Sequence, residues 1–301
     1  RERRAEPEAR RQVVQIAGEK TPMLIKTKDG TTLYATRDLA AALYRFRQYG
    51  FARSLYVVDR GQSLHFKQLF AVLGLLGFEW AKRCVHVPFG LIRFKGKKTS
   101  TRGGNVVLLE EVFAEAIDEV RPIITAAQPD LSPEELERTA RQIGIGAVVF
   151  ANVLPQRDKD VDFDWDKALS LTGDSGPYLQ YTVARCHSIE RKAGAASADV
   201  AVDYARLTHD AEWAVARRLL ELGDHVTRAV DHCEPHVVAH YLLELAGEFS
   251  RWYTLGNGDA SLRVLCDDAE LRAARLALVR QVRVWLTRGL ALLGLGAPEA
   301  M

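Results

Sequence analysis

The sequence predicts an α/β domain followed by an all-α domain, and we place the two domains at residues 1–167 and 168–301. In the first part, apolar runs at 55–59 and 85–87 flank a segment of helical period. Strand, helix and strand in this order are typical of a parallel sheet. In the second part, apolar residues follow a helical period with short polar links between the segments. This pattern is typical of a helical bundle.

The composition is that of a globular protein without an overall charge bias. Of 301 residues, 48% are hydrophobic, and 41 basic residues against 39 acidic ones give a net charge of +2. Any RNA-binding surface must therefore come from local clustering. The four cysteines form no C-x-x-C pair, which favours a reducing compartment and no disulfide. We see no apolar run long enough for a bilayer and no signal peptide, and we expect a cytoplasmic protein.

Local signals predict the elements of the first part. Asp29-Gly30 lies between apolar runs and predicts a hairpin of residues 23–25 and 32–34. Gly50 and Gly77 are expected to end helices. The expected elements that follow the hairpin are a helix at 37–49, a strand at 55–59, a helix at 63–76 and a strand at 85–87. Ligands of parallel sheets bind at the carboxyl ends of the strands, so residues 59–62 and the loop after Phe94 form the expected site.

The rest of the chain predicts helices with one interruption. Ser132-Pro133-Glu134-Glu135 is a capping box that starts a helix. Alternating aspartates at 158–166 resemble a calcium loop, but Phe163 and Leu169 stand where an EF-hand needs glycine and glutamate. We therefore predict an edge strand or a loop there. The predicted helices are 110–120, 132–151, 179–191, 212–233, 236–253 and 269–293.

The stretch from Lys95 to Asn105 is the most unusual in the chain. It packs four cations, three hydroxyls and three glycines into eleven positions. Glycine lets backbone N–H groups approach a ligand, and hydroxyls and cations suit phosphate oxygens. A solvated basic loop explains the composition alone equally well.

Lys98-Thr99-Ser100-Thr101-Arg102 resembles the K-M-S-K-S loop of class I aminoacyl-tRNA synthetases, in the M-S-T-R form of arginyl-tRNA synthetases. Further stretches resemble this family in the same order, from about Met23 to the last residue. They are residues 33–39, Tyr56-Val57-Val58 with Gln62 and His65-Phe66, residues 86–90, residues 176–182, and the closing segment through Met301.

The resemblance implies the second half of a Rossmann-like catalytic domain followed by a helical anticodon-binding domain. It implies an arginine–tRNA ligase whose partners are tRNA(Arg), L-arginine and ATP with Mg²⁺, and we expect a monomer. A non-catalytic tRNA-binding paralogue and a generic α/β nucleotide-binding protein are the alternatives. Tyr34, Asp38, Gln62 and Lys98 favour the enzyme, because a pure RNA binder needs no guanidinium pocket.

The family likeness assigns Lys98, Ser100 and Arg102 to the triphosphate of ATP. Their work is positioning and charge neutralisation while the arginine carboxylate attacks the α-phosphate. Thr99 replaces the usual methionine, and Gly103 stands where the family has lysine or alanine. We expect looser packing from the first departure and the loss of a possible cation from the second.

Tyr34 and Asp38 are four residues apart and can face one pocket if Tyr34 ends a strand and Asp38 begins a helix. A carboxylate can hold a guanidinium through two parallel hydrogen bonds. The alternative is that Asp38 only complements the dipole at the helix N-terminus. The resemblance implies that Tyr34, Asp38 and Gln62 hold the arginine substrate.

For the nucleotide, the resemblance implies contacts from His65, Val87 and Phe89. His65 would lie beside the adenylate, and the backbone around His86 and Phe89 would border the adenine. A packing histidine and ordinary strand residues are the alternative explanation of these positions.

The helical part resembles the family's anticodon-binding domain, in which aromatic side chains stack on splayed bases and arginines meet phosphates. The candidate tRNA contacts are Tyr178, Gln180, Arg185, Phe249, Arg251, Trp252 and Tyr253, with Arg191 and Lys192 extending the basic stripe of Arg185. The alternatives are that Phe249 and Trp252, three residues apart, are core residues and that the basic stripe is only solvated.

His232, His236 and His240 have a spacing that could ligate zinc on one helix. Pro235 makes a continuous helix through them unfavourable, so we predict no metal site.

No segment resembles the H-I-G-H signature, which grips ATP from the other side in class I synthetases, and the first residue is Arg1. We therefore expect a fragment of a longer enzyme and predict that residues 1–301 alone do not form arginyl-adenylate. ATP–pyrophosphate exchange should stay at the level of a control without arginine. Arginine-dependent exchange above that level would overturn this prediction.

Overall fold

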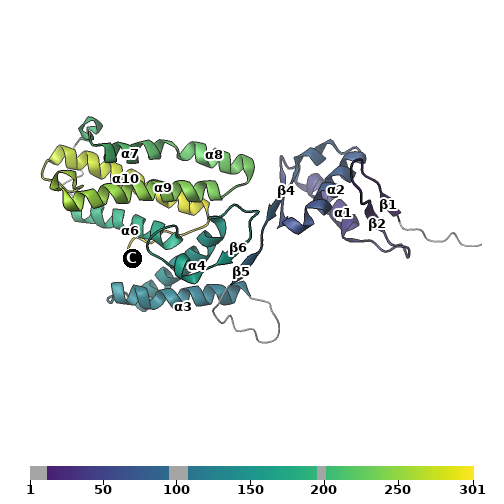
Figure 1. Cartoon of the computed structure of the whole chain (residues 1–301), viewed down its shortest axis with the longest axis horizontal. Helices are drawn as coiled ribbons and strands as arrows, with labels where there is room; N and C mark the ends of the chain where they lie inside the picture. Colours follow the sequence, from purple (N-terminus) through teal and green to yellow (C-terminus); the bar gives the residue numbers. More distant parts are fainter. Residues whose placement is uncertain (1–11, 95–107, 195–200) are drawn as a thin grey trace, which may run out of the picture. The chain divides into compact units, whose positions relative to one another are not determined.

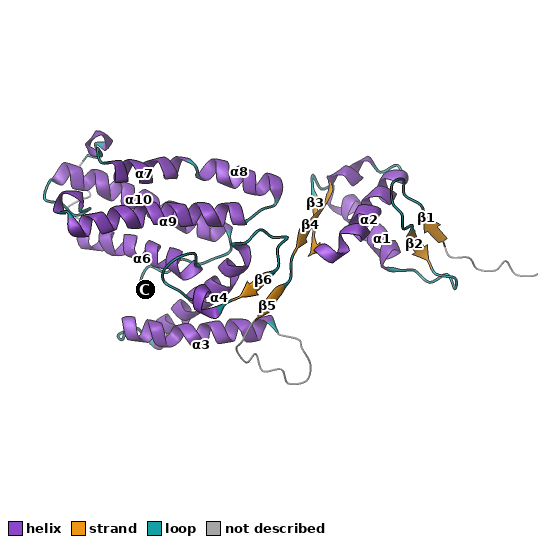
Figure 2. Ribbon diagram, in the orientation of Figure 1, coloured by secondary structure: helices purple, strands orange, loops and turns teal. Residues whose placement is uncertain are grey.

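The computed structural model describes residues 12–94, 108–194 and 201–301, and it divides into two compact units. Unit 1 comprises residues 1–91 and 158–160, and unit 2 comprises 92–157 and 161–301. The boundary between them does not coincide with the domain boundary predicted at residues 167 and 168. Figures 1 and 2 show the elements of each unit, and we describe each unit by itself.

Unit 1 contains two small sheets and two helices. Its elements are β1 (Gln12–Val14), β2 (Met23–Lys26), α1 (Tyr34–Tyr49), β3 (Ser54–Asp59), η1 (Arg60–Gln62), α2 (Ser63–Leu75), η2 (Glu79–Arg83) and β4 (Cys84–Phe89). Strands β3 and β4 are parallel, in register from Ser54 opposite Cys84 to Asp59 opposite Phe89. The predicted parallel pairing is therefore confirmed. Helix α1 ends at Gly50, which has a φ of 53° and needs the freedom of glycine.

The predicted hairpin is only partly present. Strand β2 pairs with β1, and residues 32–34 contribute a single bridge between Thr32 and Lys26 before α1 begins at Tyr34. The Asp29 carboxylate accepts hydrogen bonds from the hydroxyls of Thr27 and Thr31, which lower its pKa. These local hydrogen bonds stabilise the turn, so it forms without a second full strand after it.

Unit 2 is mainly helical and also contains one short parallel pair of strands. Its elements are β5 (Ile92–Phe94), α3 (Leu109–Ala127), α4 (Pro133–Val153), β6 (Val161–Phe163), α5 (Trp165–Ala168), α6 (Gly176–Ala193), η4 (Tyr204–Arg206), α7 (Asp210–Leu220), α8 (Leu222–His232), α9 (His236–Gly258), η5 (Ala260–Leu262) and α10 (Ala269–Leu292). The capping box of α4 is confirmed, since Ser132 and Glu135 bond each other's backbone N–H groups. Strand β6 pairs with β5, as the expectation of a strand at 158–166 allowed.

The predicted helix at 212–233 is two helices. Helix α7 ends at Leu220, α8 begins at Leu222, and Glu221 separates them. Gly223 lies two residues after Glu221, and glycine is a poor helix former, so helix propensity is low near the break. Helix α8 ends at Cys233, whose φ is 54°.

The core of unit 2 lies where α6, α9 and α10 meet, and α7 and α8 cover α9 (Figure 2). The wholly buried side chains of α9 include Tyr241, Leu245, Phe249 and Trp252. Close packing also joins α3 to α4, because Gly144 lies against the backbone of α3. A Cβ at Gly144 would be 2.9 Å from the backbone of Ala116.

We predict that Gly144→Ala lowers the free energy of unfolding by about 1–3 kcal/mol, because two helix backbones must separate to admit the methyl group. The matched control is Gly223→Ala in α8, where a Cβ meets nothing within 4 Å. This control should stabilise the protein by up to about 1 kcal/mol. Urea denaturation followed by circular dichroism measures both changes, and effects of the same sign would contradict the packing argument.

Candidate functional site

In unit 1, β3 and β4 end side by side at Asp59 and Phe89, the edge where ligands of parallel sheets bind. Asp59 accepts a hydrogen bond from the backbone of Gly61 at 2.8 Å and so shapes the turn into η1. Arg60 bonds the carboxylate of Asp160 at 3.0 Å. Gly90 lies so close to residue 159 that a Cβ would be 2.1 Å from the carbonyl oxygen of Lys159. Residues 158–160 therefore brace this edge of the sheet.

Asp38 and His65 are brought together from two helices. Asp38 lies in the second turn of α1, and His65 lies in the first turn of α2. The two atoms Nε2 of His65 and Oδ2 of Asp38 are 2.7 Å apart, and the side chains are 25% and 42% exposed. An ionised carboxylate can only accept, so Nε2–H is the donor. The imidazole therefore fixes the orientation of a carboxylate that still faces solvent.

Tyr34 and Gln62, the other two predicted arginine contacts, are both exposed. Tyr34 is the first residue of α1 and not the end of a strand, which corrects the predicted placement. It stands one turn before Asp38, so both side chains belong to the same face of α1. Gln62 ends η1, directly before the helix that carries His65. Of the residues on these two helices, His65 is the one whose contact with the Asp38 carboxylate is described.

The predicted nucleotide contacts have different surroundings. The side chain of Val87 is buried on β4, so only its backbone can meet a ligand, whereas Phe89 at the end of β4 is 40% exposed. The ring of His86 stacks on Phe66 with centroids 4.7 Å apart, and its Nε2 donates to the carbonyl of Val58. This favours a packing role for His86. Lys98, Ser100 and Arg102 lie outside the described residues.

In unit 2, a pocket of about 210 Å³ opens between α6, the end of α9 and the segment after η5. Its polar lining includes Arg185, Lys192, Tyr253, Asn257 and Arg263. Three cations, an aromatic ring and a side-chain amide in one pocket can hold a base and the phosphates beside it. Sequence reasoning identified Arg185, Lys192 and Tyr253 but not Asn257 and Arg263, because a turn sequence gives no sign of the pocket it closes.

The guanidinium of Arg185 lies over two aromatic rings of the bundle. Its central carbon is 4.7 Å from the ring centroid of Tyr181 and 4.9 Å from that of Tyr253. Such stacking orients the cation without using its hydrogen-bond donors. Arg185 can therefore meet a phosphate or a base edge while Tyr253 keeps it in place.

Three predicted tRNA contacts are wrong. Gln180, Phe249 and Trp252 are 0% exposed, so their side chains cannot meet RNA. Gln180 donates to the carbonyls of Gln142 and Gly296 and joins distant segments of the bundle. Phe249 and Trp252 are core residues, as the alternative held. Tyr178 is half-buried, with its hydroxyl 3.1 Å from that of Ser250.

Two predicted basic contacts lie elsewhere. Arg251 is exposed and pairs with Glu248 one turn earlier on α9. Arg191 donates to the carbonyl of Glu299, and neither arginine lines the pocket.

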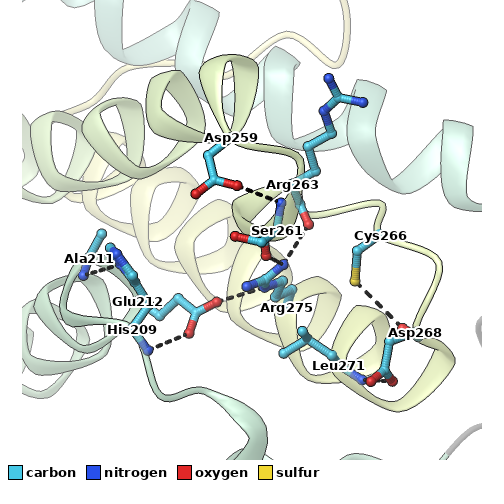
Figure 3. A network of polar contacts seen from close by, with 10 residues as sticks. All are labelled: His209, Ala211, Glu212, Asp259, Ser261, Arg263, Cys266, Asp268, Leu271 and Arg275. Atoms are coloured by element: carbon cyan, nitrogen blue, oxygen red, sulfur yellow. Dashed lines mark hydrogen bonds and ion pairs between the residues drawn. The ribbon is translucent and has the colours of Figure 1, made fainter.

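A buried ion pair fixes the wall of the pocket (Figure 3). Nε of Arg275 on α10 donates to Glu212 on α7 at 2.6 Å, and the two side chains are 4% and 1% exposed. Nη1 of Arg275 donates to the carbonyls of Ser261 and Arg263 at 2.7 and 2.8 Å. Glu212 also accepts from the backbone N–H of His209. The segment that lines the pocket is thus tied to two helices at once.

Among the described residues, little supports a cysteine nucleophile, a metal site or a membrane-spanning helix. Burial raises the pKa of the thiols of Cys84 and Cys186, so neither suits a thiolate nucleophile. No group of three or more His, Cys, Asp or Glu in the described ranges could hold a metal ion. No described helix is both long enough and apolar enough to cross a membrane.

Comparison with known proteins divides the sequence into two family regions. Residues 5–165 match the catalytic domain of class I tRNA synthetases of the arginine type, and residues 179–301 match the DALR anticodon binding domain. The chain is 47% identical over 283 residues to the arginine–tRNA ligase of Exiguobacterium sibiricum and 43% identical over 280 residues to that of Clostridium perfringens. Each alignment covers 93% of this chain and 48% of the relative, so the chain spans about half the length of these proteins.

Among solved structures, the arginyl-tRNA synthetase of Thermus thermophilus is similar in fold, with a TM-score of 0.83 and 30% sequence identity. The match covers 95% of this chain and 52% of that structure. These findings confirm the predicted fold class, a Rossmann-like parallel-sheet part followed by a helical anticodon-binding domain.

Proposed function

Because the chain belongs to the class I arginyl-tRNA synthetases, we propose that it carries the arginine-binding residues and the tRNA-binding helical domain of an arginine–tRNA ligase. The whole enzyme attaches arginine to tRNA(Arg) at the expense of ATP. The observation that carries this proposal is the Asp38 carboxylate of α1, which His65 from the first turn of α2 orients.

Asp38 is the receptor for the guanidinium of arginine. An ionised carboxylate has about four lone-pair sites, and His65 uses one of them on Oδ2. The remaining sites can accept two parallel N–H bonds from a guanidinium, which a lysine ammonium cannot supply in the same geometry. Tyr34, one turn before Asp38 on α1, and Gln62, at the end of η1, would add polar contacts to the ligand, and selection of arginine over lysine would follow.

ATP with Mg²⁺ is the co-substrate of this proposed reaction. Phe89 and the backbone of Val87 stand at the carboxyl edge of β3 and β4, where a nucleotide would lie. Lys98, Ser100 and Arg102 would neutralise the triphosphate as pyrophosphate leaves. His65 then contributes to arginine binding by orienting Asp38, in addition to any contact with the adenylate.

The pocket of unit 2 is the proposed contact for tRNA. Tyr253 offers a ring for stacking, while Arg185, Lys192 and Arg263 supply charge for the backbone of an unpaired loop. Tyr178 remains a proposed contact on the same helix as Arg185. We further propose that the protein is a cytoplasmic monomer, which sedimentation and cell fractionation would test.

We predict that residues 1–301 bind a transcript of tRNA(Arg) more tightly than a lysine tRNA transcript, and that Tyr253→Ala weakens this binding. Stacking on one base contributes about 1–3 kcal/mol, so the loss should be about 5- to 150-fold. The matched control is Tyr204→Ala, which removes an exposed tyrosine of the same unit outside the pocket.

Filter binding across a salt series measures this effect. Equal binding of both transcripts, lost steeply with salt, would show only counterion release at a basic surface. The assignment of the pocket would then be wrong.

We also predict that Asp38→Asn weakens arginine binding by about 10- to 150-fold, because hydrogen bonds to a charged group contribute about 1.5–3 kcal/mol. Equilibrium dialysis with radiolabelled arginine measures the affinity, and lysine serves as the competing ligand. Glu79→Gln is the control, since Glu79 is an exposed carboxylate that pairs only with nearby Lys82 among the described contacts. An unchanged affinity in Asp38→Asn would show that arginine binds elsewhere and would overturn the assignment of Asp38.

A further inference from the structure

We propose that Arg275 is a positioning residue for RNA binding, which acts by holding Arg263 at the rim of the unit 2 pocket. This inference rests on the proposed function of that pocket. Arg275 itself is 3% exposed and does not line the pocket. Its influence must therefore pass through the residues that it holds.

The bonds of Arg275 converge on the segment that forms the pocket wall. Two of its donors, both on Nη1, are used on the carbonyl oxygens of Ser261 and Arg263. A third donor, on Nε, meets Glu212. The acceptors belong to different elements, so the planar guanidinium fixes the distance between α7 and residues 261–263 at the end of η5. Figure 3 shows the three bonds meeting at one side chain.

The wall segment is also fixed from its other side. The Asp259 carboxylate accepts from the backbone N–H of Ser261 at 2.8 Å, and hydrogen bonding from the side chain and then the backbone of Ser261 lowers the pKa of Asp259. Gly256 lies against the segment, since a Cβ there would be 3.0 Å from the carbonyl oxygen of Leu262. Little freedom remains for the backbone that carries Arg263.

The rigid backbone of this segment holds the side chain of Arg263 in place. Its Nε donates to the carbonyl of Gly256 at 3.2 Å, so its stem is directed along the end of α9. The two terminal amino groups of the guanidinium carry the remaining donors, which suit phosphate oxygens. Ordering a long arginine side chain on binding costs conformational entropy, and an Arg263 already oriented loses less of it.

A purely structural role for the buried pair is the competing explanation, and Arg275→Lys separates the two. Lysine keeps the charge beside Glu212 but gathers its donors on one nitrogen, so it cannot serve all three acceptors in the same geometry. Asp259→Ala is a second variant that loosens the same segment from its solvent side. Arg283→Lys is the matched control, because Arg283 is also on α10, pairs with Glu190 and does not line the pocket.

The experiment measures binding of the tRNA(Arg) transcript by residues 1–301 across a salt series, with circular dichroism to verify folding. We expect Arg275→Lys to weaken binding about 5- to 10-fold and Asp259→Ala to weaken it less. If Arg263 loses its phosphate contact, the slope of log affinity against log salt should become shallower by about 0.7. Arg283→Lys should behave as the parent.

Each variant is then combined with Arg263→Ala. Positioning through Arg263 requires that Arg275→Lys and Asp259→Ala have no further effect in the Arg263→Ala background. An equal loss in both backgrounds, or unchanged binding by both variants, overturns the inference while tRNA binding by the parent stands. Failure of the parent to select tRNA(Arg) overturns the proposed function itself, and this inference with it.

Discussion

The helical unit depends on one buried ion pair, that of Glu212 and Arg275. Removing two charges from water is costly, and the attraction between them compensates only when their other hydrogen-bonding groups are also satisfied. Here the backbone N–H of His209 donates to Glu212, and the carbonyls of Ser261 in η5 and of Arg263 directly after it accept from Arg275. Loss of one partner would leave the other charge buried and alone, at a cost of about 3–5 kcal/mol. A helix start, a helix interior and a loop are therefore joined in a single arrangement.

The Asp38 carboxylate of unit 1 is also paired with a nitrogen-bearing side chain, but it is more exposed to solvent than Glu212. Its partner His65 comes from another helix, as Arg275 does, but the Asp38 side chain remains 42% exposed. Solvent screens such a pair, so its contribution to stability is small. What the pair offers instead is orientation, because a carboxylate held by one oxygen presents its remaining lone pairs in a fixed direction. The buried carboxylate of Glu212 therefore supports the fold, whereas the more exposed carboxylate of Asp38 can bind a ligand.

Much of the fold could be predicted from local sequence, and much of the candidate site could not. The parallel pairing of β3 and β4 follows from two apolar runs around a helix, and four consecutive residues from Ser132 are enough to predict the capping box. Phe249 and Trp252 lie in the core because α9 is covered by α6, α7, α8 and α10, which its own sequence does not reveal. Gln180 is buried because its amide meets carbonyls 38 and 116 residues away. The partners of Asp38 and Arg275 are likewise 27 and 63 residues distant, beyond the range of any helical or strand pattern.

The three residues 158–160 have a consequence for any attempt to dissect the molecule. They belong to unit 1, although the residues on both sides of them belong to unit 2. The polypeptide therefore passes between the units more than once, and a single cut by a protease cannot release either unit intact. A polypeptide that stops at Leu91 would lack the carboxylate of Asp160, which accepts from both Arg60 and the Leu91 backbone. Gene fragments meant to yield the sheet alone should carry a graft of this short return segment.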